Sequence, residues 1–297
     1  MDNRITVLYR GDISSCNYHC SYCSFKNHRI IKADFHSDKA DLENFITWIK
    51  KNDDVIFSVF FTPKGEILSL PEKHFKYNYD NYYIKGITEL SGLSNIEKIV
   101  TQTNLSCGLD WLEQTRCEKL AFWCTYHPEQ ADLDEFLRKV NFLSTKSISL
   151  SAGIVGIKEN FEIIKLLKAR LPANVYLWVN AYKHKNYYSP EDIEFLIKID
   201  KYFEINNSCH ISSGKKCISG YSAFSIRNNG NIYRCHFDDE IIGDIKTSNI
   251  KSLMNEQTCK KNNCGCYIGY IFLERLGLDK IYGKGLLERN PDINFHD

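Results

Sequence analysis

The feature that most constrains this chain is an alternation of short apolar runs with amphipathic runs of helical period, which extends from Thr6 to about Asp200. Six runs rich in β-branched and aromatic residues predict strands at residues 6–9, 55–61, 98–101, 120–123, 147–151 and 175–179. Strands that alternate with helices pair in parallel, and helices cover the sheet that they form. The pattern therefore predicts an α/β fold with six strand and helix pairs.

Several of the intervening helices have local support in the sequence. Apolar residues at helical spacing predict helices at 39–51 and 160–171. Two further helices have start signals: Asp132 stands three residues before Glu135, and Ser189 stands directly before Pro190. An acceptor side chain at the N-cap and proline at the first helical position both favour helix initiation.

Three cysteines follow the first predicted strand with the spacing Cys-x3-Cys-x2-Cys, at Cys16, Cys20 and Cys23. A structural zinc site or a fully ligated iron–sulfur cluster takes four protein ligands, whereas three thiolates hold three irons of a [4Fe–4S] cube and leave the fourth iron open. The alternative is a set of buried or zinc-bound thiols. The cluster is the better interpretation, because this spacing is uncommon by chance and here follows a strand.

This spacing, with the aromatic Tyr22 before the last cysteine, resembles the signature of the radical S-adenosylmethionine (SAM) superfamily. The resemblance implies a partial (β/α)6 TIM-like barrel over residues 1–205 and an oxygen-sensitive [4Fe–4S] cluster held by Cys16, Cys20 and Cys23. It also implies reductive cleavage of SAM to a 5′-deoxyadenosyl radical, which would abstract hydrogen from a substrate.

A SAM site would lie at the carboxyl ends of the strands, where barrels place their ligands. Gly65-Glu66 resembles in part the Gly-Gly-Glu turn that binds the SAM amino group, although Lys64 replaces one glycine and the residues also suit a plain turn. Residues 151–159 resemble a Gly-x-Ile-x-Gly-x-x-Glu motif, one residue short between its glycines. A histidine at a strand end is at least as often structural as ligand-binding. The candidate SAM-binding residues are Tyr22, Gly65, Glu66, Gln102, Asn104, His127, Ser151, Gly153, Ile154 and Asn180.

A second group of cysteines occupies the last part of the chain: Cys217, Cys235, Cys259, Cys264 and Cys266. Asn229-Gly230, between two alternating runs, predicts a tight β-hairpin within this group. Cysteines around such a hairpin resemble the SPASM and twitch extensions of radical SAM enzymes. The resemblance implies a second [4Fe–4S] cluster in a small domain over residues 206–297, with one of the five cysteines spare. A zinc ribbon with four cysteine ligands stays open as an alternative.

Four further cysteines lie outside these two groups. We expect Cys107, Cys117 and Cys124 to be small core residues, because free cysteine packs as a buried hydrophobe, and Cys209 is ambiguous. Twelve cysteines without an export signal favour metal or redox chemistry in a reducing compartment over a disulfide framework. With no apolar run long enough to span a bilayer, we expect a cytoplasmic protein without a membrane partner.

The charge balance of 38 basic and 37 acidic residues gives no general attraction for nucleic acid. The aromatic and basic segment at 73–83 fits a surface connection better than a nucleic-acid platform. A different class of function, a zinc-stabilised binding module that uses this segment, is therefore weakly supported.

The sequence thus predicts a radical SAM enzyme that modifies a peptide or a protein side chain, with a small polar metabolite as the alternative substrate. A one-electron donor such as flavodoxin or ferredoxin would be its partner. Residues 9–11, 14–18, 264–270 and 285–289 also resemble an uncharacterised bacterial radical SAM family, although Tyr267 stands where histidine is usual. That family implies no particular substrate.

Overall fold

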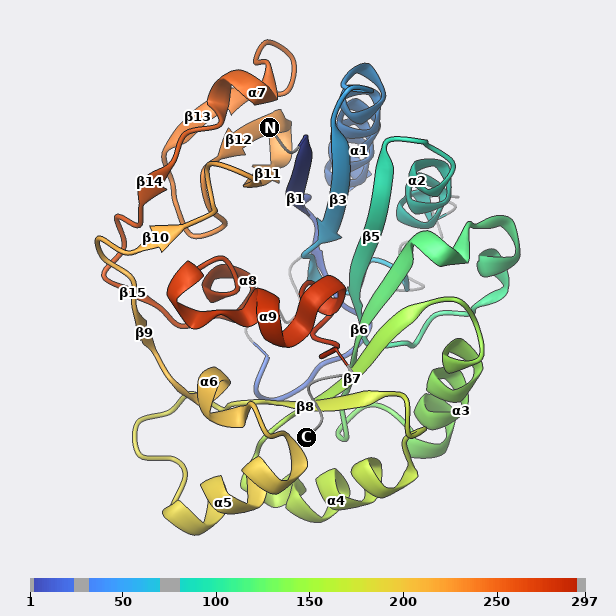
Figure 1. Ribbon diagram of the computed structural model, residues 1–297. Coiled ribbons are helices and arrows are strands. Elements are labelled where there is room, and N and C mark those ends of the chain that lie inside the picture. Colours follow the sequence, from blue (N-terminus) through green and yellow to red (C-terminus); the bar gives the residue numbers. More distant parts are fainter. Residues whose placement is uncertain (1–2, 24–31, 70–80, 293–297) are drawn as a thin grey trace.

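The computed structural model describes residues 3–23, 32–69 and 81–292 (Figure 1). Its centre is a sheet in which six parallel strands are paired in the order in which they occur along the chain. These strands are β1 (Arg4–Arg10), β3 (Ile56–Phe61), β5 (Ile96–Thr103), β6 (Leu120–Tyr126), β7 (Ser149–Val155) and β8 (Tyr176–Asn180). The predicted α/β fold with a parallel sheet is confirmed.

Helices alternate with these strands and lie on the outside of the curved sheet (Figure 1). They are α1 (Lys32–Lys51), α2 (Tyr82–Ser91), α3 (Leu133–Ser144), α4 (Phe161–Arg170) and α5 (Pro190–Ile199). The predicted start signals are confirmed. The Asp132 side chain accepts the backbone N–H of Glu135, and Ser189 forms a capping box with Asp192. The helix predicted at 39–51 is longer, since α1 begins at Lys32.

Two predictions concern segments that the structure describes only in part. Residues 70–80 lie outside the described residues, so most of the aromatic and basic segment predicted at 73–83 does too. In the described part of the chain, none of the helices has the length and apolar character needed to cross a membrane.

The carboxyl-terminal third extends the same sheet from its β1 edge. Strand β11 (Ala223–Arg227) pairs in parallel with β1, and β12 (Asn231–Tyr233) and β13 (Ile241–Asp244) continue the sheet in antiparallel pairs. The predicted hairpin at Asn229-Gly230 is confirmed, with positive φ angles of 60° and 80° at its turn. Strands β8 and β13 are the two edges of this nine-stranded sheet, so within the described residues the barrel is open and not closed.

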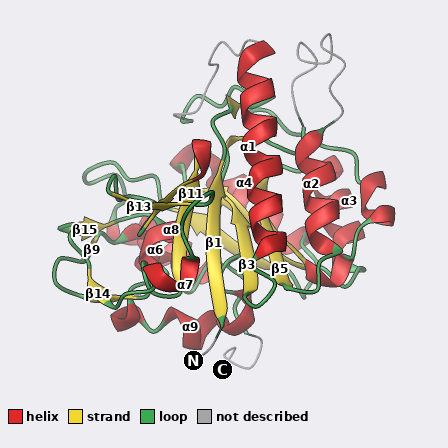
Figure 2. Cartoon of the chain, turned by 90° about the horizontal axis from the view of Figure 1, so that it is seen from above, coloured by secondary structure: helices red, strands yellow, loops and turns green. Residues whose placement is uncertain are grey.

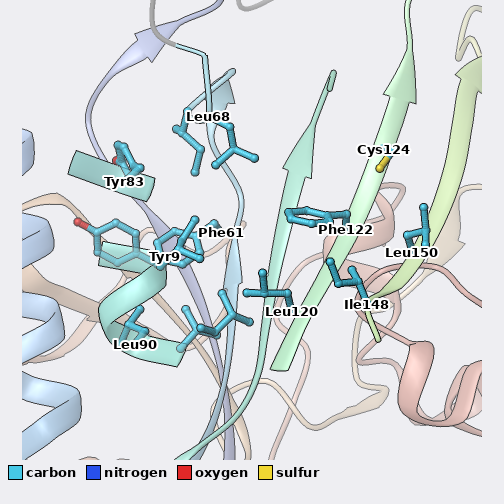
Figure 3. Packing of buried hydrophobic residues seen from close by; sticks show 14 of the residues in the cluster. Tyr9, Phe61, Leu68, Tyr83, Leu90, Leu120, Phe122, Cys124, Ile148 and Leu150 are labelled. Carbon is cyan, nitrogen blue, oxygen red and sulfur yellow. The ribbon is translucent and has the colours of Figure 1, made fainter. Parts of the chain in front are cut away.

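Alternate side chains of the parallel strands enter two separate cores. Tyr9, Phe61, Phe122 and Leu150 point to the helix-covered face and pack in one continuous cluster (Figure 3). Their chain neighbours Leu8, Phe60 and Ala121 point to the inner face, as does Trp178 of β8. This alternation follows from the two-residue period of a strand.

The inner face is filled by the end of the described chain. Helices α8 (Tyr267–Tyr270) and α9 (Leu278–Tyr282) lie inside the curve of the sheet (Figure 1). Arg289, 2% exposed, lies over the rings of Trp178 and Tyr267, with centroid distances of 4.2 and 4.4 Å. A cation over aromatic faces gains electrostatic attraction while its apolar surroundings exclude water. Arg289 and the residues that it contacts thus fill the inner face of the sheet.

Short elements link these parts: α6 (Phe203–Asn207), β9 (His210–Ile211), β10 (Lys216–Cys217), α7 (Ile250–Leu253), β14 (Gln257–Thr258) and β15 (Asn263–Cys264). The strands β9 and β13 to β15 lie on the opposite side of the molecule from α2 and α3 (Figure 2). The boundary predicted at residue 205 falls within α6. Residues on both sides of it contribute to the same two cores, as Phe224 and Ile226 pack with residues of β1.

Candidate functional site

The loop with Cys16, Cys20 and Cys23 begins at the carboxyl end of β1. Its first residues form β2 (Ser14–Ser15), which pairs in parallel with β4 (Lys64–Gly65), the turn after β3. Gly65 has a φ of 129°, a conformation that side chains with a Cβ rarely adopt. The pairing therefore places the cysteine loop directly beside the predicted Gly65-Glu66 turn.

Cys20 and Tyr22 both contact His127, which follows β6. Cys20 Sγ lies 3.4 Å and the Tyr22 hydroxyl 2.8 Å from His127 Nδ1. Burial lowers the pKa of His127 to about 4, so the ring is neutral at physiological pH and Nδ1 can accept a hydrogen bond. The three predicted residues form one contact group.

Cys16 lies beside the end of β5. The Asn104 side chain donates to Asn17 Oδ1 at 3.1 Å, and its amide nitrogen lies 3.8 Å from Cys16 Sγ. The backbone N–H of Tyr18 donates to the same sulfur at 3.4 Å. Such N–H groups are the donors expected around a sulfur that carries negative charge. Burial raises the pKa of the Cys16 thiol to about 12, an effect that coordination to a metal reverses.

Glu66 is 1% exposed and holds the end of β5 in place. Its carboxylate accepts the N–H of Asn104 at 2.5 Å, the N–H of Leu68 at 2.9 Å and the hydroxyl of Thr103 at 3.0 Å. Burial raises its pKa to about 7, against the lowering effect of these donors. A carboxylate offers about four acceptor positions, so about one is left for a further donor.

The sequence reasoning missed two residues that hold the middle of the cysteine loop. Glu129 accepts from the backbone N–H and the hydroxyl of Ser21, at 2.7 and 2.6 Å. Gln130 accepts from the N–H of His19 at 3.1 Å. Both follow His127-Pro128 at the carboxyl end of β6, so their position after a strand was the available signal.

The remaining candidates are not joined to the cysteine loop by a described hydrogen bond. Ser151 is fully buried in β7, where its hydroxyl donates to Glu288 O and accepts Trp178 Nε1–H at 2.9 Å. Gly153 packs against the Trp178 ring, and a Cβ there would lie 2.0 Å from it. Ile154 packs in the helix-side core. These contacts are structural, and a SAM contact of these three stays a prediction.

Gln102 on β5 and Asn180 at the end of β8 are partly buried. No side-chain hydrogen bond of either is found among the described residues, and their proposed contacts to SAM also stay predictions.

The cysteines of the carboxyl-terminal group separate into two sets. Burial raises the pKa of Cys264 to about 12, and Cys235, Cys259, Cys217 and, to the smallest extent, Cys266 raise it further. Cys217 and Cys259 in turn raise the pKa of Cys235 after burial does. Cys235 and Cys264 therefore both lie near Cys217 and Cys259.

Cys266 and Cys209 are the other set, and both are exposed. A Cβ at Gly265 would lie 3.5 Å from Cys209 Sγ, and Gly265 O accepts the Lys183 ammonium. Burial lowers the pKa of Lys183, while Cys266 and Cys209 raise it. Of the five predicted ligands, Cys266 is therefore the one that is exposed, and it lies near Cys209 and Lys183 as well as Cys264.

The three cysteines expected in the core are buried or partly buried. Cys107 and Cys124 are 5% and 0% exposed, and Cys117 packs against the same cluster.

In the described part of the chain, no three His, Cys, Asp or Glu side chains are arranged to hold one metal ion. Burial raises the pKa of Cys16, and Cys23 and Cys20 raise it further, so the thiols of the first loop lie near one another.

The fold has solved counterparts. No family model matches the sequence, and no match is found among curated proteins. The structure resembles anSMEcpe with bound AdoMet and the Cp18Cys peptide, at a TM-score of 0.52 and 15% identity, over 84% of this chain and 80% of that one. It also resembles Streptococcus suis SuiB bound to S-adenosylmethionine, at 0.52 and 13%, over 84% of this chain and 65% of that one. The chain therefore has the fold found in these radical SAM enzymes.

Proposed function

We propose that this protein is a radical SAM enzyme, which holds a [4Fe–4S] cluster through Cys16, Cys20 and Cys23. The observation that carries the proposal is their position: three thiols on one loop, at the carboxyl end of a parallel sheet, beside Glu66, Asn104 and His127. When bound, the cluster would supply an electron that cleaves SAM, and the deoxyadenosyl radical would take hydrogen from the substrate.

The protein side chains would position the reactants and exclude water. Asn104 and the N–H of Tyr18 donate toward Cys16, so they would stabilise its negative charge when it coordinates iron. His127 fixes Tyr22 and Cys20 relative to each other. Glu66 fixes Thr103 and Asn104, and its remaining acceptor position suits the SAM ammonium.

The second cluster would use Cys217, Cys235, Cys259 and Cys264, with Cys266 as the spare cysteine. Cys217 and Cys259 both raise the pKa of Cys235 and of Cys264, which supports this assignment, and Cys266 is the exposed cysteine of the five. Four thiolates complete the ligands of a cube. A cluster without an open iron suits electron transfer during product formation. Flavodoxin or ferredoxin would supply the first electron.

A peptide or a protein side chain is the substrate class that we favour. Support comes from the similar fold of anSMEcpe, whose structure contains a bound peptide.

The test is anaerobic purification and reconstitution with iron and sulfide, followed by measurement of iron, sulfide and zinc. The wild type should hold about eight irons and the Cys16/Cys20/Cys23→Ala variant about four. With SAM and dithionite, the wild type alone should form 5′-deoxyadenosine. Zinc at the carboxyl-terminal site with deoxyadenosine retained would remove the second cluster from the proposal. Absence of both iron and SAM cleavage would overturn it.

A further inference from the structure

A cationic cavity of about 220 Å³ lies where β1 and β11 end. Arg10 and Arg227 are the last residues of these parallel strands and are paired in register. The side chains that line the cavity are Arg10, Asp12, Lys64, Arg227, Asn228 and His236.

The cavity carries more positive than negative charge. Arg10 donates through Nε to Thr62 O at 2.6 Å, and among the described residues neither Arg10 nor Lys64 has a carboxylate partner. Arg227, by contrast, pairs with Asp239 at 3.3 Å and donates to the carbonyl oxygens of His236 and Asp238. Asp12 supplies the one carboxylate among the described lining residues. Two unpaired cations against this carboxylate leave an excess of one positive charge.

Arg10 is largely shielded from water, unlike a charged side chain on the surface. Burial lowers its pKa to about 10, Cys266 raises it and Arg227 lowers it. The guanidinium remains charged at physiological pH, in a site where little water screens it. A cation in such a place interacts with an anion more strongly than it would in bulk water.

The cavity is lined by residues that lie next to both cysteine groups. Lys64 pairs with Ser14, close to Cys16 in the first loop. On the other side, His236 follows Cys235 directly. An anion bound in the cavity would therefore lie between the two proposed cluster sites.

We propose that this cavity binds a carboxylate of the substrate, held by Arg10 and Lys64. A carboxylate carries the single negative charge that the excess positive charge matches, and its two oxygens fit the fork of an arginine. That the carboxylate belongs to the substrate rests on the proposed function, whereas the carboxylate site itself does not. The other available source of a carboxylate is SAM itself, which the experiment must distinguish.

The experiment measures how fast an amine-acylating reagent labels Lys64 in the full, anaerobically reconstituted chain, by peptide mass spectrometry. Exposed Lys246, outside the cavity, is the control in the same molecule. Sodium acetate should slow labelling of Lys64 about threefold or more relative to sodium chloride at equal ionic strength, and leave Lys246 unchanged. Equal labelling in the two salts overturns the proposal, as does protection by inorganic phosphate but not by acetate.

Separate samples with SAM identify the source of the carboxylate. If SAM alone protects Lys64 and acetate adds nothing, the cavity holds the SAM carboxylate, and the substrate assignment is wrong. Acetate that still protects in the presence of SAM supports the proposal. Measuring deoxyadenosine in the same samples separates the two proposals, since protection without SAM cleavage keeps the carboxylate site and overturns the radical function alone.

A variant that should strengthen acetate binding tests the proposal independently. Asp12→Asn keeps an oxygen that can accept from Asn228, a bond of 2.8 Å, but removes the negative charge. Acetate should then protect Lys64 at about threefold lower concentration, because one repulsive charge is gone. The matched control is Asp53→Asn, an exposed carboxylate outside the cavity, which should leave the acetate dependence unchanged. Equal behaviour of the two variants contradicts the proposal.

Discussion

Cys16, Cys20 and Cys23 come from one loop after β1, whereas Cys217, Cys235, Cys259 and Cys264 come from segments that short strand pairs bring together. In the first group, the spacing alone keeps the thiols near one another, and strand ends supply the polar surroundings. In the second group, Cys217 lies in β10, opposite Gln257 of β14, and Cys264 lies in β15, opposite His210 of β9. The first group depends on local sequence, and the second depends on correct pairing of distant segments.

This difference predicts different sensitivities. Changes around the first group should alter what the site binds but leave its ligands assembled. Changes around the second group should alter whether the ligands assemble at all, because the pairs β9–β15 and β10–β14 each contain two residues per strand. Two-stranded ribbons of this size are marginal alone, so bound metal would contribute to their stability.

The largest expected effect is the loss of the second cluster from Cys235→Ala. We expect this variant to lose about four of about eight irons, because the four-thiol set becomes incomplete. Cys266→Ala should keep its iron, since Cys266 is exposed and has the smallest effect of the four neighbouring thiols on the pKa of Cys264. Iron and sulfide are measured after reconstitution. Equal iron loss in both variants would contradict the separation of the cysteines into two sets.

The next effect concerns SAM affinity at the first group. Glu66→Gln keeps the size of the side chain but removes the charge that would meet the SAM ammonium, so the Kd for SAM should rise about tenfold or more. Isothermal titration of the reconstituted protein measures it. Glu129→Gln is the matched control, because that exposed carboxylate accepts hydrogen bonds from Ser21 of the cysteine loop. A Kd unchanged by Glu66→Gln would remove Glu66 from the SAM site.

The pH dependence of stability tests the same carboxyl group. The pKa of Glu66 is raised from 4.5 to about 7, so the folded protein keeps a proton that the unfolded chain releases within this range. Its contribution to the free energy of unfolding therefore decreases as the pH rises from about 4.5 to 7. Denaturant unfolding of the cofactor-free protein should show this slope in the wild type and less of it in Glu66→Gln. Equal slopes would show that Glu66 does not titrate in this range.

A smaller effect tests packing at the second group. A Cβ at Gly269 would lie 2.8 Å from Cys264 Sγ and 2.8 Å from the Phe237 ring. Gly269→Ala should therefore cost about 1–3 kcal/mol of unfolding free energy and reduce iron at the second site. Gly108→Ala is the control, because a Cβ there meets its nearest atom at 3.9 Å. Full iron content in Gly269→Ala would show that Cys264 can shift without losing its metal.

The smallest effect tests the local character of the first group. Glu129→Ala removes two hydrogen bonds to Ser21 in an exposed place, which should cost about 1 kcal/mol or less. Iron content should not change, since the spacing of the cysteines remains. Unfolding and iron are measured on the same preparation. A loss of iron would mean that the first group also depends on contacts from distant strands.

Much of the fold follows from periodicity and local signals. The six strands, the caps at Asp132 and Ser189, and the turn at Asn229-Gly230 are determined by neighbouring residues, and the structure contains them all. The attachment of β11 to the β1 edge had no such signal. Both strands look like apolar runs, and only the packing of the whole sheet selects their pairing.

Prediction of the site succeeded where local sequence places a residue, and failed where distant segments do. His127 and Asn104 were found because they follow strands, whose carboxyl ends meet at one edge of a parallel sheet. Ser151 was chosen by a motif, but its hydroxyl faces inward and bonds to residues near the end of the chain. A motif does not reveal that a segment more than a hundred residues away fills the inner face.

The sequence by itself determined the first cysteine group, because a short loop cannot separate its own thiols by much. Only the tertiary structure decided which of the later cysteines belong together, what fills the inner face of the sheet, and that Arg10 and Lys64 share a cavity. These features join residues far apart in the chain. Their positions depend on the total packing of the sheet and its helices, which spacing between residues does not encode.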